Sequence, residues 1–391
     1  MAEYRPAQRA SQLPPNFWGA MDREIARLSA EPGPRMIDVS KGNPDLPTPA
    51  HIVSVMQGEV DAPRNHRYPA YLPRPSVRDA IVRRYREDYG VAIDPDHEVA
   101  IFHGSHEGIM AGVLSLADPG STIVLPDPGY PMYRSAALLA GAEVVDISLA
   151  APTFQPDFDA VRNVSEASVL ILNYPNNPTG ALARPETFER AIEFAGRTGA
   201  AFIHDFAYAS LGFGGQRPLS ALEIDRGHEH TVEVQTLSKT YSMAGWRFGY
   251  AVGNASIIQA MRAYQAHAFS TIFGATQEAA AAALDGDQQI VRELTAIYER
   301  RRDLLVEGLR ALGWEVSAPE GTFFVWARVP GVDDDVAFAD RLRSELRIGV
   351  APGSGFGPGG RGYVRLGLVS DDATLAELIE RIAADTATQT H

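Results

Sequence analysis

Lys239 is the residue of this chain best placed for covalent chemistry. It lies in Thr236-Leu-Ser-Lys239, directly after the β-branched, strand-like run 231–235, so we expect it to be partly buried. Burial lowers the pKa of a lysine and leaves a neutral amine, which is a nucleophile and can form a Schiff base. Thr236 and Ser238 place hydroxyls beside it, and Arg247 supplies a guanidinium suited to a phosphate dianion. This constellation favours a reactive amine next to a phosphate site.

Lysine is rare in this chain, which strengthens the case for Lys239. Lysine occurs only at Lys41 and Lys239, and the other 33 of the 35 basic residues are arginine. Arginine replaces lysine as a surface charge but not as a neutral primary amine. We interpret Lys41 as a solvated loop charge and Lys239 as a functional residue.

Seven short β-branched runs between residues 99 and 253 predict the strands that position these groups. The runs are Val99–Phe102, Thr122–Leu125, Glu143–Ile147, Val169–Leu172, Ala201–His204, Thr231–Gln235 and Gly249–Val252. Mostly continuous apolar runs are typical of strands buried on both faces of a mostly parallel sheet. Interleaved helices such as 184–199 predict a doubly wound α/β/α domain, in which ligands bind at the carboxyl ends of the strands.

The pattern changes after residue 275. An alanine-rich segment and a charged helix are followed by two strand-like stretches, 321–328 and 363–368, with a helix between them. We therefore expect a large domain over residues 46–278 with a seven-stranded sheet, and a smaller α+β domain over 279–391. Residues 1–45 are expected to pack on the smaller domain.

Composition excludes several classes of protein. The chain of 391 residues is 45% hydrophobic and has a net charge of −14, which argues against nucleic acid or an anionic membrane as partner. No stretch approaches the roughly 20 apolar residues of a membrane helix, and residues 1–30 contain no secretory signal. Cysteine is absent, so thiolate nucleophiles, disulfides and cysteine-ligated metals are excluded, and no metal site is expected. These features predict a cytoplasmic location.

The run from Thr236 to Arg247 resembles the cofactor-lysine signature of the class I/II aminotransferases, SxSK with an arginine eight residues later. This is a fold-type-I, pyridoxal-5'-phosphate-dependent family. The residues of this motif and of Asn173-Tyr-Pro-Asn-Asn-Pro-Thr-Gly180 resemble the alanine and LL-diaminopimelate aminotransferase group of the family most. The resemblance implies that Lys239 holds the cofactor as a Schiff base and moves a proton during the reaction, and that Thr236, Ser238 and Arg247 bind the cofactor.

Further motifs match the family in order. Gly104-Ser105-His106 resembles the turn that binds the cofactor phosphate, although His106 departs from the residue usual there. Tyr130 would stack on the pyridine ring. Tyr68 resembles the tyrosine that reaches the phosphate of a neighbouring subunit, which implies a homodimer, while Leu72-Pro-Arg-Pro departs from the family's loop.

The remaining motifs imply the ring and substrate contacts. Asn177, in Asn173-Tyr-Pro-Asn-Asn177-Pro-Thr-Gly180, would bond the ring oxygen and reach the substrate. Asp205 would pair with the ring nitrogen, and Tyr208 would bond the ring oxygen. Arg365 would clamp the substrate carboxylate. Gly42 lies in a loop that would close over the substrate.

The resemblance implies transfer of an amino group from an L-amino acid to a 2-oxo acid. The same motifs also serve lyases, cyclases and oxidases on this scaffold, so these alternatives stay open. A non-catalytic regulator would need a DNA-binding module in front of residue 40. A dinucleotide-dependent dehydrogenase would need a GxGxxG turn after its first strand. The first 40 residues do not provide such a module, no GxGxxG turn follows the first strand, and the glycine-rich loop 353–360 is in the wrong place for one. No residue identifies the substrate side chain.

Overall fold

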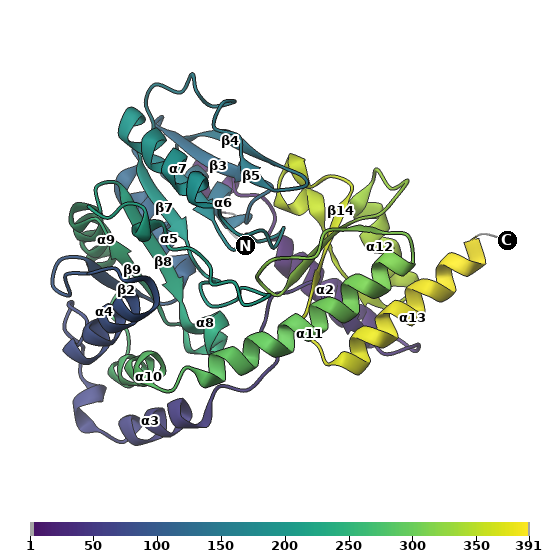
Figure 1. Ribbon diagram of the computed structural model, residues 1–391, viewed down its shortest axis with the longest axis horizontal. Coiled ribbons are helices and arrows are strands. Elements are labelled where there is room, and N and C mark those ends of the chain that lie inside the picture. Colours follow the sequence, from purple (N-terminus) through teal and green to yellow (C-terminus); the bar gives the residue numbers. More distant parts are fainter. Residues whose placement is uncertain (1–3, 390–391) are drawn as a thin grey trace.

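The computed structural model describes residues 4–389 and contains a large and a small sheet lying beside each other, with helices packed around both (Figure 1). The large sheet has eight strands. In spatial order they are β2 (Val99–Phe102), β9 (Gly249–Gly253), β8 (Thr231–Thr236), β7 (Ala201–Asp205), β6 (Val169–Asn173), β3 (Thr122–Asp127), β4 (Glu143–Ala150) and β5 (Gln155–Pro156).

The large sheet confirms the mostly parallel α/β arrangement. Strands β8, β7, β6, β3 and β4 are mutually parallel, while β9 runs antiparallel to both of its neighbours. All seven predicted strands are present. The eighth, β5, has only two residues, too few to give a periodic signal, and it pairs with the edge strand β4.

Helices cover both faces of this sheet. Successive side chains of a strand point to opposite faces, and here both sets are largely apolar and need to be buried. Ile203 packs in a cluster with helices α5 (Ser105–Leu116), α6 (Met132–Ala140) and α9 (Ala255–Ala268). The next residue back, Phe202, packs instead with α7 (Pro185–Thr198). Helices α3 (Ala50–Val60), α4 (Pro75–Tyr89) and α10 (Gly274–Asp285) share a third cluster with side chains of β2 and β9. Apolar residues on both faces of a strand therefore reflect helices on both faces.

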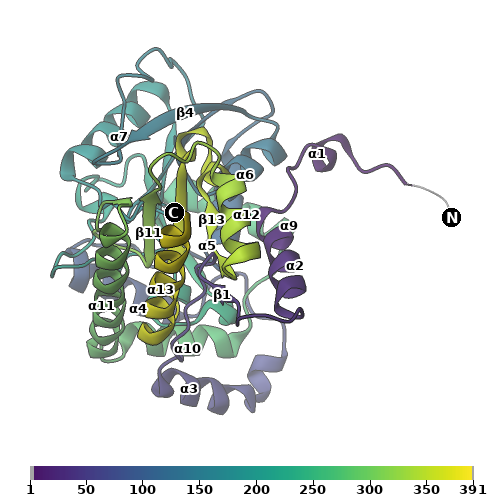
Figure 2. The same ribbon diagram turned by 90° about the vertical axis from the view of Figure 1, so that its right-hand side faces the viewer.

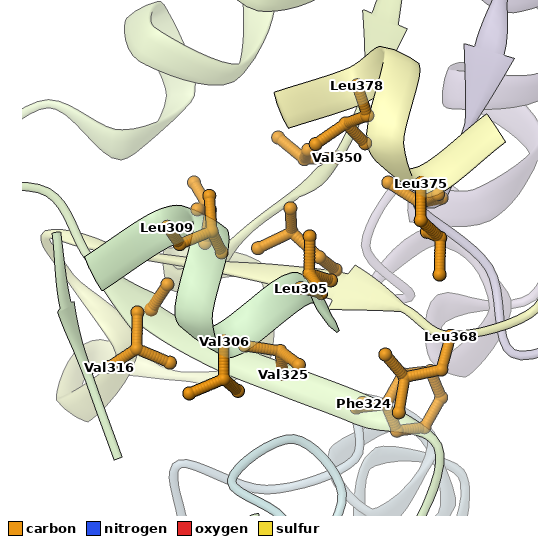
Figure 3. Packing of buried hydrophobic residues seen from close by; sticks show 14 of the residues in the cluster. Leu305, Val306, Leu309, Val316, Phe324, Val325, Val350, Leu368, Leu375 and Leu378 are labelled. Carbon is orange, nitrogen blue, oxygen red and sulfur yellow. The ribbon is translucent and has the colours of Figure 1, made fainter. Parts of the chain in front are cut away.

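The small sheet is antiparallel. Its strands are, in spatial order, β10 (Glu315–Val316), β11 (Phe324–Arg328), β14 (Tyr363–Gly367) and β13 (Ala351–Pro352). Helices α11 (Gln289–Ala311), α12 (Asp335–Glu345) and α13 (Asp372–Gln389) flank it. Leu305 and Leu309 of α11 pack with Val325 and Leu375 in its core (Figure 3).

The N-terminal segment holds α1 (Gln8–Ser11), α2 (Phe17–Ser29) and β1 (Ile37–Asp38), and α1 projects from the body of the molecule (Figure 2). Strand β1 pairs in parallel with β12 (Ile348–Gly349), which follows α12. The domain boundaries at residues 45 and 278 stay a prediction. Short helical turns complete the chain: η1 (Pro63–His66), η2 (Ala221–Glu223), α8 (Leu237–Thr240), η3 (Ala244–Trp246), η4 (Gly353–Phe356) and η5 (Pro358–Gly360).

Three parallel strands end at one edge of the large sheet and bring polar residues together there. Strand β6 ends at Asn173, β7 at Asp205 and β8 at Thr236. In α/β folds, ligands bind at this edge. None of the helices within residues 4–389 is both long enough and apolar enough to cross a membrane.

Candidate active site

A cavity of about 320 Å³ lies at this edge, between the two sheets. It gathers every residue singled out from the sequence as a site residue except Gly104 and Tyr68. The predicted residues that line it are Gly42, Ser105, His106, Tyr130, Asn177, Asp205, Tyr208, Thr236, Ser238, Lys239, Arg247 and Arg365. Segments more than 300 residues apart in the sequence thus form one site.

One end of the cavity is built from backbone N–H groups and a guanidinium. Gly104 precedes α5 with φ of +91°, a conformation that favours glycine, and a Cβ added there would lie 2.5 Å from a terminal nitrogen of Arg247. Arg247 donates to the carbonyl oxygens of Ala244 and His103, at 2.9 and 3.1 Å. Within the part of the chain that the structure describes, Arg247 pairs with no carboxylate. A helix N-terminus beside an unpaired guanidinium suits a phosphate group.

The two hydroxyls beside Lys239 are bonded to each other. The oxygens of Thr236 and Ser238 lie 2.9 Å apart, and the Thr236 hydroxyl also caps the short helix α8 at the Ser238 N–H. His106 lies at the same end. Desolvation, and then the positive charge of Arg247, hold the pKa of His106 below its usual value.

Lys239 is half-buried in the wall of the cavity. Its Nζ donates a hydrogen bond to the carbonyl oxygen of Gly42, at 2.7 Å. Burial, with the positive charges of Arg365 and Arg247, lowers the pKa of Lys239 to about 8. A substantial fraction of the amine is therefore neutral near pH 8. In the same loop as Gly42, Lys41 also reaches the cavity lining and pairs with Asp22 of α2, so it is not simply a solvated charge.

Asp205 is a buried carboxylate with no cationic side chain in ion-pair contact within residues 4–389. It accepts hydrogen bonds from the hydroxyl of Tyr133 at 2.6 Å and from the N–H of Ala207 at 3.2 Å. Burial raises the pKa of Asp205 to about 6. Sequence reasoning missed Tyr133, although it lies three residues after Tyr130, at the start of α6.

Arg365 is the second unmatched charge, and it is only 1% exposed. Its terminal nitrogens donate to Asn177 Oδ1 at 2.6 Å and to the carbonyl oxygen of Ser40 at 2.7 Å, while Nε has no hydrogen-bond partner among the described residues. Burial lowers the pKa of Arg365 to about 10. A buried guanidinium without a carboxylate is expensive, so the arrangement fits an incoming anion.

Aromatic rings that were not predicted enclose this guanidinium. The carbon at its centre lies 3.8, 4.7 and 4.9 Å from the ring centroids of Phe324, Phe356 and Trp18. Tyr208 packs edge-on against Phe324, and burial raises the pKa of its hydroxyl. Trp18 comes from α2, whose position over the cavity has no local signal in the sequence.

Tyr68 does not belong to the cavity of this chain. It is 97% exposed and is absent from the lining. Its predicted role, in the site of a second subunit, therefore stays a prediction.

A second, larger cavity of about 860 Å³ opens beside the first, and Trp18, His106, Tyr130 and Met132 line both. Most of its other lining residues are apolar and come from residues 13–20, from α6 and from the 354–358 loop. Because the two cavities share these lining residues, the second cavity leaves room next to the site for the side chain of a bound substrate.

Comparison with known proteins agrees with this geometry. Residues 34–382 match the family model described as aminotransferase class I and II. The chain is 43% identical over 374 residues to L-glutamine--4-(methylsulfanyl)-2-oxobutanoate aminotransferase of Bacillus subtilis, covering 95% of this chain and 94% of the relative. It is 41% identical over 380 residues to LL-diaminopimelate aminotransferase of Dehalococcoides mccartyi, covering 96% and 98%.

The fold is also similar to solved structures. The structure of apo-BacF of Bacillus subtilis superimposes with a TM-score of 0.95 and 36% identity, covering 98% of this chain and 99% of that one. Fold, site and comparisons together show that the chain belongs to the class I and II aminotransferase family and is an enzyme that transfers an amino group between an amino acid and a 2-oxo acid.

Proposed function

We propose that the cavity binds pyridoxal 5'-phosphate and that Lys239 is its covalent anchor. The observation that carries the proposal is the trio formed by a lysine of lowered pKa and two unmatched buried charges, Asp205 and Arg365. A protonated ring nitrogen would match Asp205, and a substrate carboxylate would match Arg365. The phosphate would match Arg247 and the N-terminus of α5, where Ser105 is the first residue.

When bound, this cofactor supplies a conjugated ring that accepts the electron pair left at the substrate Cα. The residues of the chain provide binding, orientation and proton transfer. Arg365 and Asn177 would hold the substrate carboxylate, which orients the Cα–H bond. The Lys239 amine would remove the proton from Cα and deliver it at C4′ of the cofactor. Asp205 would hold the ring-nitrogen proton, and Trp18 and Phe324 would exclude water.

We further propose that the preferred amino donors carry an unbranched apolar or thioether side chain. Among the described residues, the lining of the second cavity contains no aspartate or glutamate, and its one arginine, Arg134, is paired with Asp146. A distal ammonium group, such as that of diaminopimelate, would lack an anionic partner there. The relative from Bacillus subtilis acts, by its name, on a methylsulfanyl oxo acid.

We also propose a homodimer in which Tyr68 of one subunit completes the phosphate site of the other. Tyr68, Tyr71, Leu72, Phe269 and Phe273 are exposed large apolar residues. Side chains of this kind are enriched at interfaces. Mixing inactive Tyr68→Ala and Lys239→Ala subunits should restore about a quarter of the native sites if sites are shared. No restoration would contradict sharing. The cytoplasmic location stays a prediction.

A half-reaction tests the substrate proposal. The protein loaded with pyridoxal phosphate is mixed with single amino acids, and absorbance follows conversion of the cofactor aldehyde to the amine. Methionine and other linear apolar donors should convert it faster than aspartate or diaminopimelate. Faster conversion by diaminopimelate would refute the side-chain assignment, and no conversion by any donor would refute the proposed cofactor site.

A further inference from the structure

A buried histidine–glutamate pair lies directly behind Asp205, outside the cavity lining. His204 and Glu233 are neighbours on the parallel strands β7 and β8, and both side chains are 0% exposed. His204 Nδ1 lies 2.7 Å from Glu233 Oε1. A pair of ionisable groups with fully buried side chains is costly unless both are fully hydrogen-bonded.

The hydrogen bonds fix Glu233 as a carboxylate. Besides His204, three donors face it: Ala221 N at 2.6 Å, Ser220 Oγ at 2.7 Å and Tyr85 Oη at 2.8 Å. The Tyr85 oxygen itself accepts from Gln235, and the Ser220 oxygen accepts from the N–H of Leu222, so both hydroxyl hydrogens are directed to Glu233. Three donors stabilise the ionised form of the carboxyl group.

The second nitrogen of His204 settles its charge. Nε2 lies 2.9 Å from the carbonyl oxygen of Tyr174, which can only accept, so Nε2 carries a hydrogen. Nδ1 carries one as well, because Glu233 is ionised. The ring is therefore an imidazolium. It packs against the aromatic ring of Phe206, with centroids 4.7 Å apart and planes 27° from parallel, an environment that favours a cation.

This cation also contacts the segments that build the site. Its bond to Tyr174 holds the loop that carries Asn177. Just before this loop, Asn173 at the end of β6 donates to the carbonyl oxygen of Asp205 at 2.7 Å and accepts from the Asn177 N–H at 2.8 Å. Burial raises the pKa of Asp205, and the positive charge of His204 acts against that rise.

We propose that His204, held as an imidazolium by Glu233, is a positioning residue that keeps Asp205 ionised for a protonated pyridine ring. The assignment rests on the proposed cofactor site. Tyr133 acts on Asp205 through a direct hydrogen bond. His204 acts on Asp205 through its positive charge alone and does not touch the cofactor.

The charge state is tested directly by NMR of the protein labelled with ¹⁵N-histidine, with and without pyridoxal phosphate. At pH 8 both ring nitrogens of His204 should carry hydrogen, and the signals should vanish in His204→Asn. A bare ring nitrogen on His204 would overturn the proposal. This readout needs neither turnover nor bound cofactor.

The matched control is another largely buried histidine–glutamate pair, His228 and Glu98, whose Nδ1–Oε1 distance is 2.9 Å and which does not line the cavity. Pyridoxamine phosphate, which has no aldehyde, serves as a noncovalent probe, and benzyl phosphate as a probe without a ring nitrogen. His204→Asn should weaken pyridoxamine phosphate binding by about tenfold, the effect of one pKa unit on its partner. Benzyl phosphate binding should stay unchanged, and His228→Asn should alter neither.

The Glu233→Gln variant tests the same charge through the partner of His204, so the result does not depend on a single substitution. It should weaken pyridoxamine phosphate binding as much as His204→Asn, and the double variant should be no weaker than either. Equal losses for both probes would show a merely structural role, and native affinity in His204→Asn would also overturn the proposal. If the native protein binds no pyridoxamine phosphate, the cofactor site itself fails, while the NMR result still decides the charge of His204.

Discussion

Replacing Asp205 with asparagine should stabilise the cofactor-free protein while it removes an essential charge. In the folded chain the pKa of Asp205 is raised from 3.8 to about 6. The unfolded chain therefore loses this proton at lower pH than the folded chain. The folded chain therefore favours the protonated form of Asp205. The stability that this form contributes is intact below pH 3.8, falls as the pH rises toward 6, and stays lost above pH 6.

The magnitude follows from the two pKa values of Asp205, 3.8 in the unfolded chain and about 6 in the folded one. At about 1.4 kcal/mol per unit, the ionised Asp205 costs roughly 3 kcal/mol at pH 8 and about half of that at pH 5. Asparagine keeps the shape of the side chain but removes its charge. Rearranging the hydrogen bond to Tyr133 costs up to about 1 kcal/mol, which reduces the gain in stability. We expect a net gain of about 2 kcal/mol at pH 8, or a rise in Tm of roughly 2–3 °C for a chain of this size.

The assay is thermal unfolding of cofactor-free protein by circular dichroism at pH 5 and pH 8, at one protein concentration. Asp225→Asn is the control of opposite sign. Burial alone would raise the pKa of Asp225, but the N–H groups of Glu229, His230 and Thr231, each at 3.0 Å, hold it below its usual value. That substitution should lower Tm. A lower Tm in Asp205→Asn at pH 8, or a gain as large at pH 5, would show that burial of the ionised Asp205 does not destabilise the fold.

Three other substitutions probe the remaining parts of the site. Arg365→Lys loses the paired geometry of a guanidinium, so kcat/KM should fall about 30- to 100-fold, chiefly through KM, with unchanged cofactor absorbance; native kinetics would contradict the carboxylate role. Gly104→Ala should lower Tm and weaken cofactor binding, whereas Gly90→Ala, at φ of +66° with nothing within 4 Å of its Cβ, should lower Tm alone; titration with pyridoxamine phosphate separates the two. Tyr133→Phe removes the hydroxyl bonded to Asp205 and should reduce kcat/KM about tenfold, and native activity would make that contact incidental.

The sequence predicted the fold where local pattern reports directly on packing. Strands such as β6 and β7 are buried on both faces, so each forms a short continuous apolar run, and the polar residue that ends it marks the edge of the sheet. That is why Asp205 and Lys239 could be placed at the same edge. Strands β5, β12 and β13 have two residues each, and only tertiary pairing defines them.

The walls of the site could not be predicted in the same way. Trp18, Phe324 and Phe356 reach Arg365 from three separate elements, and nothing in the local sequence of each indicates a common target. The charge of His204 was equally hidden, because it follows from hydrogen-bond partners on other elements rather than from its neighbours in the chain.

Covalent binding of the cofactor by Lys239 can be measured simply, because the chain contains only two lysines. Protein loaded with pyridoxal phosphate is reduced with borohydride, digested, and mapped by mass spectrometry. Only Lys41 and Lys239 can carry a reduced side-chain adduct, so Lys41 is an internal control. We predict one pyridoxyl phosphate group per chain, on Lys239, and none in Lys239→Ala. An adduct on Lys41 alone, or an unmodified Lys239 in a protein that converts amino acids, would contradict the account.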